Sequence, residues 1–134
     1  MKTVLQPEGW PRPRGYANGV AAQGRQVFVA GMVGWNAAGE FESDDLAAQV
    51  RQALLNVRAV LEEAGARPEH MVRMTWYVVS RAEYLARGRE IGAAYREVLG
   101  AHYDVAMSAV EVSALMEARA RVEIEVTAVV PQAL

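Results

Sequence analysis

The stretch SDDLAAQVRQALLNVRAVLEEAGARP, residues 43–68, decides the fold because it predicts one long amphipathic helix. Its apolar residues recur at spacings of three and four, as on the buried stripe of a helix. They are Leu46, Val50, Ala53, Leu54, Val57 and Leu61. Ser43 or Asp44 is expected to cap the N-terminus. Gly65 stands where a left-handed C-terminal residue belongs, and Pro68 follows it.

Strand-forming segments lie on both sides of this helix. Upstream, residues 19–23 and 26–33 are β-rich and are expected to form a hairpin that turns at Gly24 and Arg25. Downstream, residues 71–79 predict a strand, and Ser80 with Glu83 forms a capping box for a second helix that ends at Gly100. Two final strands are expected near residues 105–112 and 121–130. The predicted order is β-β-α-β-α-β-β, which defines an α+β domain.

The chain of 134 residues fits one domain, spanning residues 1–134. Residues 1–15 hold Pro7, Pro11 and Pro13, which disfavour a helix or a central strand, so an extended proline-rich arm is expected there. This segment lacks the apolar core of a secretory signal. No apolar run approaches the roughly 18 residues of a membrane span, so no membrane partner is expected.

Composition and charge narrow the possible functions. The absence of cysteine excludes disulfides, thiolate nucleophiles and cysteine-ligated zinc, and it fits a cytoplasmic protein. His70 and His102 lack the spacing of a metal site, and phosphate-binding glycine loops are missing, so neither a metal nor a cofactor is expected. The net charge of −2 comes without a concentrated basic patch, so no nucleic-acid partner is expected.

The predicted strands carry bulky apolar side chains on both faces. Val27 and Val29 alternate with Phe28, and Trp76 precedes Tyr77. Two helices can cover only one face of a sheet, so the second face is expected to pack against another copy of the chain. The alternative is that the proline-rich arm covers this face.

Five segments spread along the chain carry a family resemblance. They are RGYANGV at 14–20, VFVAG at 27–31, AQVRQALLN at 48–56, EAG at 63–65 and VEIEVTA at 122–128. In this order and spacing they resemble the RidA family, also called YjgF, of reactive-intermediate (enamine/imine) deaminases. The resemblance implies a chorismate-mutase-like α+β fold with one mixed sheet and two helices on one face. It also implies a barrel-like homotrimer whose inter-subunit clefts bind a small-molecule metabolite and hydrolyse enamines or imines without a cofactor.

The same resemblance places Met107 where the family has a carboxylate-binding arginine, within residues 105–108. Gly92 occupies the position where many members of the family have a ligand-facing asparagine, and Ala109 occupies that of a reactive cysteine. Methionine has no N–H donor and cannot pair with a carboxylate. A substrate other than 2-iminopropanoate is therefore expected, larger and less charged, such as an aromatic-pathway intermediate.

Glu123 matches the family's glutamate that positions water, and Tyr16 matches the tyrosine that lines the cleft. The alternative is that Glu123 and Glu125 are ordinary outward residues of an alternating strand, with Arg119 or Arg121 as candidate partners. The alternative for Tyr16 is a half-buried aromatic ring with a solvated hydroxyl. Gly31 lets a ligand approach the backbone closely, or it marks a position where a larger side chain does not fit.

Arg12 and Arg14 precede the cleft tyrosine, and either is a candidate to restore the positive charge that position 107 lacks. The alternative is that both are solvated. The favoured function is a hydrolase in which Glu123 is the catalytic residue. The alternative is a non-catalytic trimer that holds a metabolite in its clefts. RNA cleavage is disfavoured by the acidic charge balance.

Overall fold

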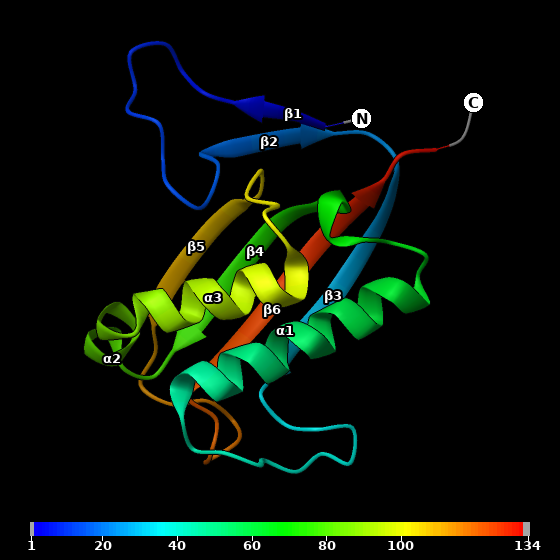
Figure 1. Cartoon of the computed structure of the whole chain (residues 1–134). Coiled ribbons are helices and arrows are strands. Elements are labelled where there is room, and N and C mark those ends of the chain that lie inside the picture. The colour runs from blue at the N-terminus through cyan, green and yellow to red at the C-terminus, as the bar shows by residue number, and fades with distance from the viewer. Residues whose placement is uncertain (1, 133–134) are drawn as a thin grey trace.

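The computed structural model of the protein describes residues 2–132 (Figure 1). Its elements are β1 (Lys2–Leu5), β2 (Gly19–Ala22), β3 (Arg25–Val33), α1 (Leu46–Glu63), a 3₁₀ turn η1 (Pro68–His70), β4 (Met71–Val78), α2 (Arg81–Ala86), α3 (Gly88–Leu99), β5 (Ala106–Glu111) and β6 (Val122–Val130).

Four strands form the main sheet in the order β3-β6-β4-β5. Strand β6 is antiparallel to both β3 and β4, whereas β5 runs parallel to β4 at the edge of the sheet. Helices α1 and α3 pack side by side across one face of this sheet, as Figure 1 shows. The predicted α+β fold, with a mixed sheet and its helices on one face, is confirmed.

The N-terminal segment differs from the prediction. Strand β1 pairs antiparallel with β2 in a separate two-stranded sheet, so part of the expected arm is a strand, which ends before Pro7. The predicted hairpin between residues 19–23 and 26–33 is wrong, because β2 pairs with β1 while β3 pairs with β6. The chain passes between the two sheets at Gly24, which has a φ of 148°. A Cβ at Gly24 would lie 2.2 Å from the carbonyl oxygen of Val130, so only glycine fits there.

Helix α1 follows the predicted apolar stripe. Its buried residues are Leu46, Gln49, Val50, Ala53, Leu54, Val57 and Leu61. Asp45, rather than Ser43 or Asp44, caps the helix, since its carboxylate accepts a hydrogen bond from the backbone N–H of Ala48 at 3.0 Å. Gly65 has a φ of 72° just after the helix, as the sequence predicted.

The second predicted helix is divided into α2 and α3. The break falls at Arg87, whose guanidinium donates to the carboxylate of Asp45 at 2.9 Å and so ties the junction to the start of α1. Gly88 follows, and glycine is a poor helix former. Ser80 caps α2 by accepting a hydrogen bond from the N–H of Glu83 at 3.1 Å. No helix within residues 2–132 has the length and apolar character to cross a membrane.

Gln49 is a polar side chain in the buried stripe of α1, only 1% exposed. Its amide nitrogen donates to the carbonyl oxygens of Ser43 and Arg119, both at 3.0 Å, and its amide oxygen accepts from the N–H of Arg121 at 2.8 Å. A Cβ at Gly34 would lie 2.7 Å from the Cα of Gln49, so glycine lets the end of β3 approach α1. Gln49 therefore joins the helix to the segment that leads into β6.

Replacing Gln49 with leucine is expected to lower the free energy of unfolding by about 2–3 kcal/mol, because three partly buried backbone groups lose a partner whose own side chain is fully buried. Urea denaturation followed by circular dichroism measures this change. Gln52→Leu is the matched control on the same helix. Within residues 2–132 the Gln52 side chain bonds only that of Asn56, so its loss is expected to cost about 0.5 kcal/mol. Equal destabilisation by the two variants would contradict the role assigned to Gln49.

Candidate functional site

A groove of about 900 Å³ lies along the edge strand β5 on the helical side of the sheet. It is lined by Arg14, Gly15, Tyr16, Trp76, Tyr84, Leu85, Gly88, Ile91, Gly92, Tyr95, Arg96, Tyr103, Met107, Ser108 and Ala109. Arg14, Tyr16 and Met107 come from distant parts of the sequence, and the fold brings them together here. Gly92 and Ala109, which the family resemblance also marked, line the same groove.

The loop before β2 is held against the start of β5. The backbone N–H of Ala17 donates to the carbonyl oxygen of Val105 at 2.9 Å, and Ala17 forms a parallel bridge with Ala106. This attachment places Tyr16, which is 42% exposed, at the groove beside β5. The attachment of this loop to β5 therefore explains why Tyr16 lines the groove of this chain.

Aromatic rings form one wall of the groove. Tyr95 stacks on Tyr103 with ring centroids 5.2 Å apart, and Trp76 meets Tyr84 edge-on at 6.2 Å. The hydroxyl of Tyr95 donates to the carbonyl oxygen of His102, which fixes the ring. Burial raises the pKa of both Tyr84 and Tyr95, so these phenols stay neutral at physiological pH.

Met107 adds to this apolar surface. It pairs with Met74 in the register of β4 and β5 and packs, partly buried, against the hydrophobic core. Its thioether offers no N–H donor for a carboxylate. The groove therefore has no cation at position 107.

The positive charges of the groove are Arg14 and Arg96, and none of its described lining residues is acidic. Arg96 was not among the residues predicted from the sequence to bind a ligand. A Cβ at Gly92 would lie 3.3 Å from the Nη1 atom of Arg96, so the guanidinium extends over the glycine. The four-residue spacing of these two residues within a predicted helix was the available signal, because such residues are neighbours on one helix face.

Gly31 and Glu123 lie on the opposite face of the sheet. Strand β3 has a bulge between Val29 and Met32, where two residues oppose Glu125. The bulge turns Gly31 toward the carboxylate of Glu123, since a Cβ at Gly31 would lie 2.1 Å from the Oε2 atom. Of the two interpretations of Gly31, the geometry favours the one in which a larger side chain does not fit.

The carboxylate of Glu123 accepts no hydrogen bond and forms no ion pair within residues 2–132. The arginines considered as its partners are engaged elsewhere. Arg119 pairs with Asp44 at 2.9 Å, and Arg121 pairs with Glu83 at 3.3 Å. Glu123 is therefore not paired with either arginine, whereas its outward place on an alternating strand, opposite Tyr77, agrees with the alternative interpretation.

Glu125 lies on the same face as Glu123 but is engaged in a hydrogen bond. It accepts from the hydroxyl of Tyr77 at 2.5 Å, and this bond raises the pKa of the tyrosine. Of these two carboxylates, Glu123 is the one left free to accept a hydrogen bond from water.

Within one chain, the groove and Glu123 face away from each other. Met107 shares the helical face with its register partner Met74, whereas Glu123 is paired with Tyr77 on the other face. Side chains alternate between the two faces of a strand, so no rotamer change can bring Met107 and Glu123 together. The predicted site residues thus fall into two groups, one on each face.

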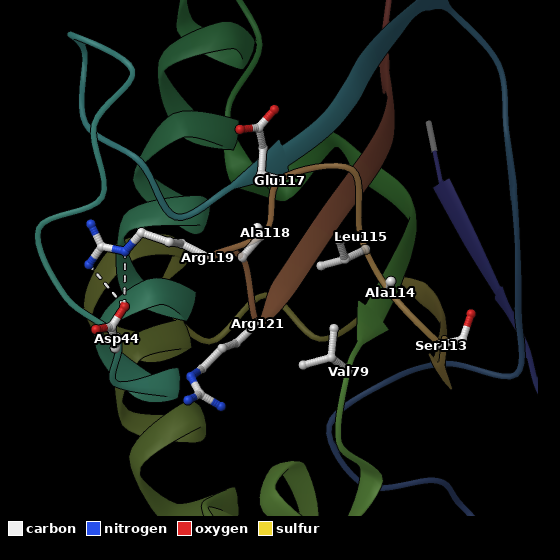
Figure 2. Close-up of a pocket in the computed structure, with 10 residues that line it drawn as sticks. Asp44, Val79, Ser113, Ala114, Leu115, Glu117, Ala118, Arg119 and Arg121 are labelled. Atoms are coloured by element: carbon white, nitrogen blue, oxygen red, sulfur yellow. Dashed lines mark hydrogen bonds and ion pairs between the residues drawn. The ribbon is translucent and has the colours of Figure 1, made fainter.

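A second hollow, of about 430 Å³, lies beside residues 113–121 (Figure 2). Figure 2 shows Arg119 turned toward Asp44, and Arg121 is paired with Glu83 as described above. Acids of the chain thus neutralise both arginines that line this hollow. Within residues 2–132, no three His, Cys, Asp or Glu side chains are grouped to hold a metal ion.

Comparisons with known proteins agree with this architecture. The family model described as Endoribonuclease L-PSP matches residues 11–130. A RutC family protein of Pyrococcus abyssi is 33% identical over 115 residues, which cover 85% of this chain and 87% of that protein. The crystal structure of YyfB, a Rid-family protein of unknown function from Yersinia pestis, has a TM-score of 0.80 and 38% identity, covering 96% of this chain and 98% of that one. The structure of Rv2704 from Mycobacterium tuberculosis, a member of the YjgF/YER057c/UK114 family, has a TM-score of 0.64 and 33% identity. The match covers 97% of this chain and 100% of that one.

The mixed four-stranded sheet, with helices on one face and a groove along its parallel edge, defines a small α+β protein of the Rid type. The chain belongs to the Rid family, which also carries the names YjgF and L-PSP. The family membership inferred from the sequence is confirmed.

Gly31→Ala is expected to displace the Glu123 carboxylate while lowering the free energy of unfolding by about 1 kcal/mol or less, because the end of a flexible side chain can move aside. A crystal structure of the variant shows the displacement, and urea denaturation measures the stability. In a Glu123→Ala background the same substitution is expected to cost less, since the clashing carboxylate is gone. Glu123 in an unchanged position in the single variant would contradict the close contact.

Proposed function

We propose that this protein is a cofactor-independent hydrolase of an enamine or imine metabolite that acts as a cytoplasmic homotrimer in clefts between subunits. The observation that carries the proposal is the division of the candidate site between two faces. One face offers a ligand-sized groove, and the other offers the partly buried carboxylate of Glu123, which is unpaired within residues 2–132. A site that uses both must be built from two copies of the chain.

The face opposite the helices supports such an assembly. Phe28 is 70% exposed and Val110 is 44% exposed on this face, and both are apolar residues that a second copy would cover. Polar side chains also lie there, among them Thr75 and Thr127, so the interface would be mixed in character. Packing this face against the β5 edge of a neighbour would bring Glu123 of one subunit to the groove of the next.

The reaction needs little beyond water and a proton acceptor. Glu123 accepts a proton from water as the water oxygen bonds to the imine carbon and the C=N π pair moves to nitrogen. Glu123 returns this proton to nitrogen, which gives a carbinolamine. The hydroxyl proton of the carbinolamine then passes through Glu123 to nitrogen as the C=O double bond forms and the C–N bond breaks. The products are a ketone and ammonia, and no oxidant, reductant or cofactor takes part. The apolar side chain of Met107 makes 2-iminopropanoate, which the family's arginine would hold, a poor substrate.

Glu123→Gln is expected to lower kcat/KM at least roughly a hundredfold, because glutamine cannot accept the proton from water. The assay generates imines in situ from a panel of amino acids with an amino-acid oxidase and follows ammonia release. Glu125→Gln is the control on the same strand face and is expected to change the rate less than about tenfold. Undiminished turnover in Glu123→Gln would contradict the catalytic role. Ligand binding without turnover of any imine would support the alternative, a non-catalytic metabolite-binding trimer.

The wild-type protein is expected to have a mass of about three times 14.6 kDa by multi-angle light scattering at micromolar concentration. Phe28→Glu is expected to shift the protein toward monomer, because it buries a charge in the proposed interface. Val60→Glu, on the outer side of α1, is the control and is expected to remain a trimer. A monomeric wild type would contradict both the assembly and the inter-subunit cleft.

A further inference from the structure

Helix α3 places a guanidinium at the groove by combining a glycine with an arginine. Gly92 and Arg96 are one helical turn apart, and both line the groove. The Nη1 atom of Arg96 lies 3.3 Å from the position of a Cβ on Gly92. A larger side chain at position 92 would compete with the guanidinium for this space. The glycine therefore allows Arg96 to extend along the groove wall.

Arg96 has no counter-charge in the described part of the chain. Within residues 2–132 its guanidinium donates no hydrogen bond and forms no ion pair. Its neighbour Glu97 is already paired with Arg51 at 2.5 Å. No carboxylate belongs to the described lining of the groove. This cation is therefore free to bind an anionic group of a ligand.

The rest of the groove suits an apolar ligand body. Its lining is aromatic and aliphatic, and it includes the largely buried Trp76, Ile91 and Tyr95 with the partly buried Tyr103 and Met107. At about 900 Å³ the groove exceeds the needs of a three-carbon acid and lies in the range of pockets for larger ligands. A ligand that fills it would combine one anionic group with a large apolar part.

We infer that Arg96 is the anion-binding residue of the groove and that it selects substrates in which a carboxylate is joined to an aromatic or other bulky apolar side chain. The inference rests on the proposed function, since it names the substrate class of the same site. It also replaces the expectation of a less charged substrate. The positive charge that Met107 does not provide comes from α3, on the other wall of the groove.

Arg14 is the other arginine of the groove, but its setting is less suited to holding an anion. It lies in an irregular loop next to Gly15 and is exposed. Arg96 is on a helix whose adjacent Tyr95 and nearby Val98 are buried, so its backbone is fixed relative to the aromatic wall. A fixed cation loses less conformational entropy on binding.

The test uses isothermal calorimetry with phenylpyruvate, its uncharged methyl ester and pyruvate as probes. The wild type is expected to bind phenylpyruvate at least roughly tenfold more tightly than either of the other two. Arg96→Gln is expected to raise the Kd for phenylpyruvate by roughly ten- to a hundredfold and to leave the Kd for the ester unchanged. Glutamine has a similar helix propensity and the position is exposed, so the variant is expected to fold. Arg96→Lys is expected to keep part of the affinity, since it retains a charge without the guanidinium fork.

Arg89→Gln is the matched control, since Arg89 is an exposed arginine on the same helix outside the groove. Unchanged phenylpyruvate binding in Arg96→Gln would overturn the inference, as would a larger loss in Arg14→Gln. Pyruvate binding as tight as phenylpyruvate binding, or no phenylpyruvate binding by the wild type, would overturn the substrate class.

Hydrolysis of 2-imino-3-phenylpropanoate separates this inference from the proposed function. Arg96-dependent binding without any turnover would support the inference and contradict the hydrolase. Turnover with the same KM in the wild type and Arg96→Gln would support the hydrolase and contradict the role of Arg96.

Discussion

The alternation of side chains along β6 sends Ile124 and Val126 under the helices and Glu123 and Glu125 to the opposite face of the sheet. The core requires this register, because a shift by one residue would bury the two carboxylates beneath α1 and α3. The same constraint fixes the register of β4 and β5 and places Met107 on the helical side. The hydrophobic core thus determines that groove and carboxylate are separate in one chain. The case for a site shared between subunits follows from this separation.

Glycines at three positions act by leaving space, and none of the three has a positive φ. Gly34 lets the end of β3 approach the backbone of Gln49, which carries the hydrogen bonds that hold the segment leading into β6. Gly31 makes room for the carboxylate of Glu123, and Gly92 makes room for the guanidinium of Arg96. One of these contacts serves the core, whereas the other two set the positions of charged groups. In each case, the space that a side chain on the glycine would fill is occupied by another residue. That residue is either distant in the sequence or one helical turn away.

The sequence predicted the elements whose signals are local. The apolar stripe of residues 46–61, the Ser80 cap and the left-handed Gly65 all appear where they were expected. The predictions were wrong where the structure of a segment depends on a residue or strand that is distant in the sequence. Gly24 resembles a hairpin turn, but β2 and β3 each pair with another strand, and the break at Arg87 depends on the remote carboxylate of Asp45.

The same limit applies to the candidate site. The family resemblance pointed to Tyr16 and Met107, which the fold brings to one groove. It could not reveal Arg96, because a free guanidinium is recognised only when the partners of the surrounding charges are known. Glu97, the nearest acid in sequence, is occupied by Arg51 of α1. If Arg96 on the helical wall binds a carboxylate, as proposed, Met107 and Ala109 of β5 would contact the apolar part of the ligand. On that proposal, Met107 and Arg96 would together set one substrate specificity, and the methionine would not mean that the binding site is lost.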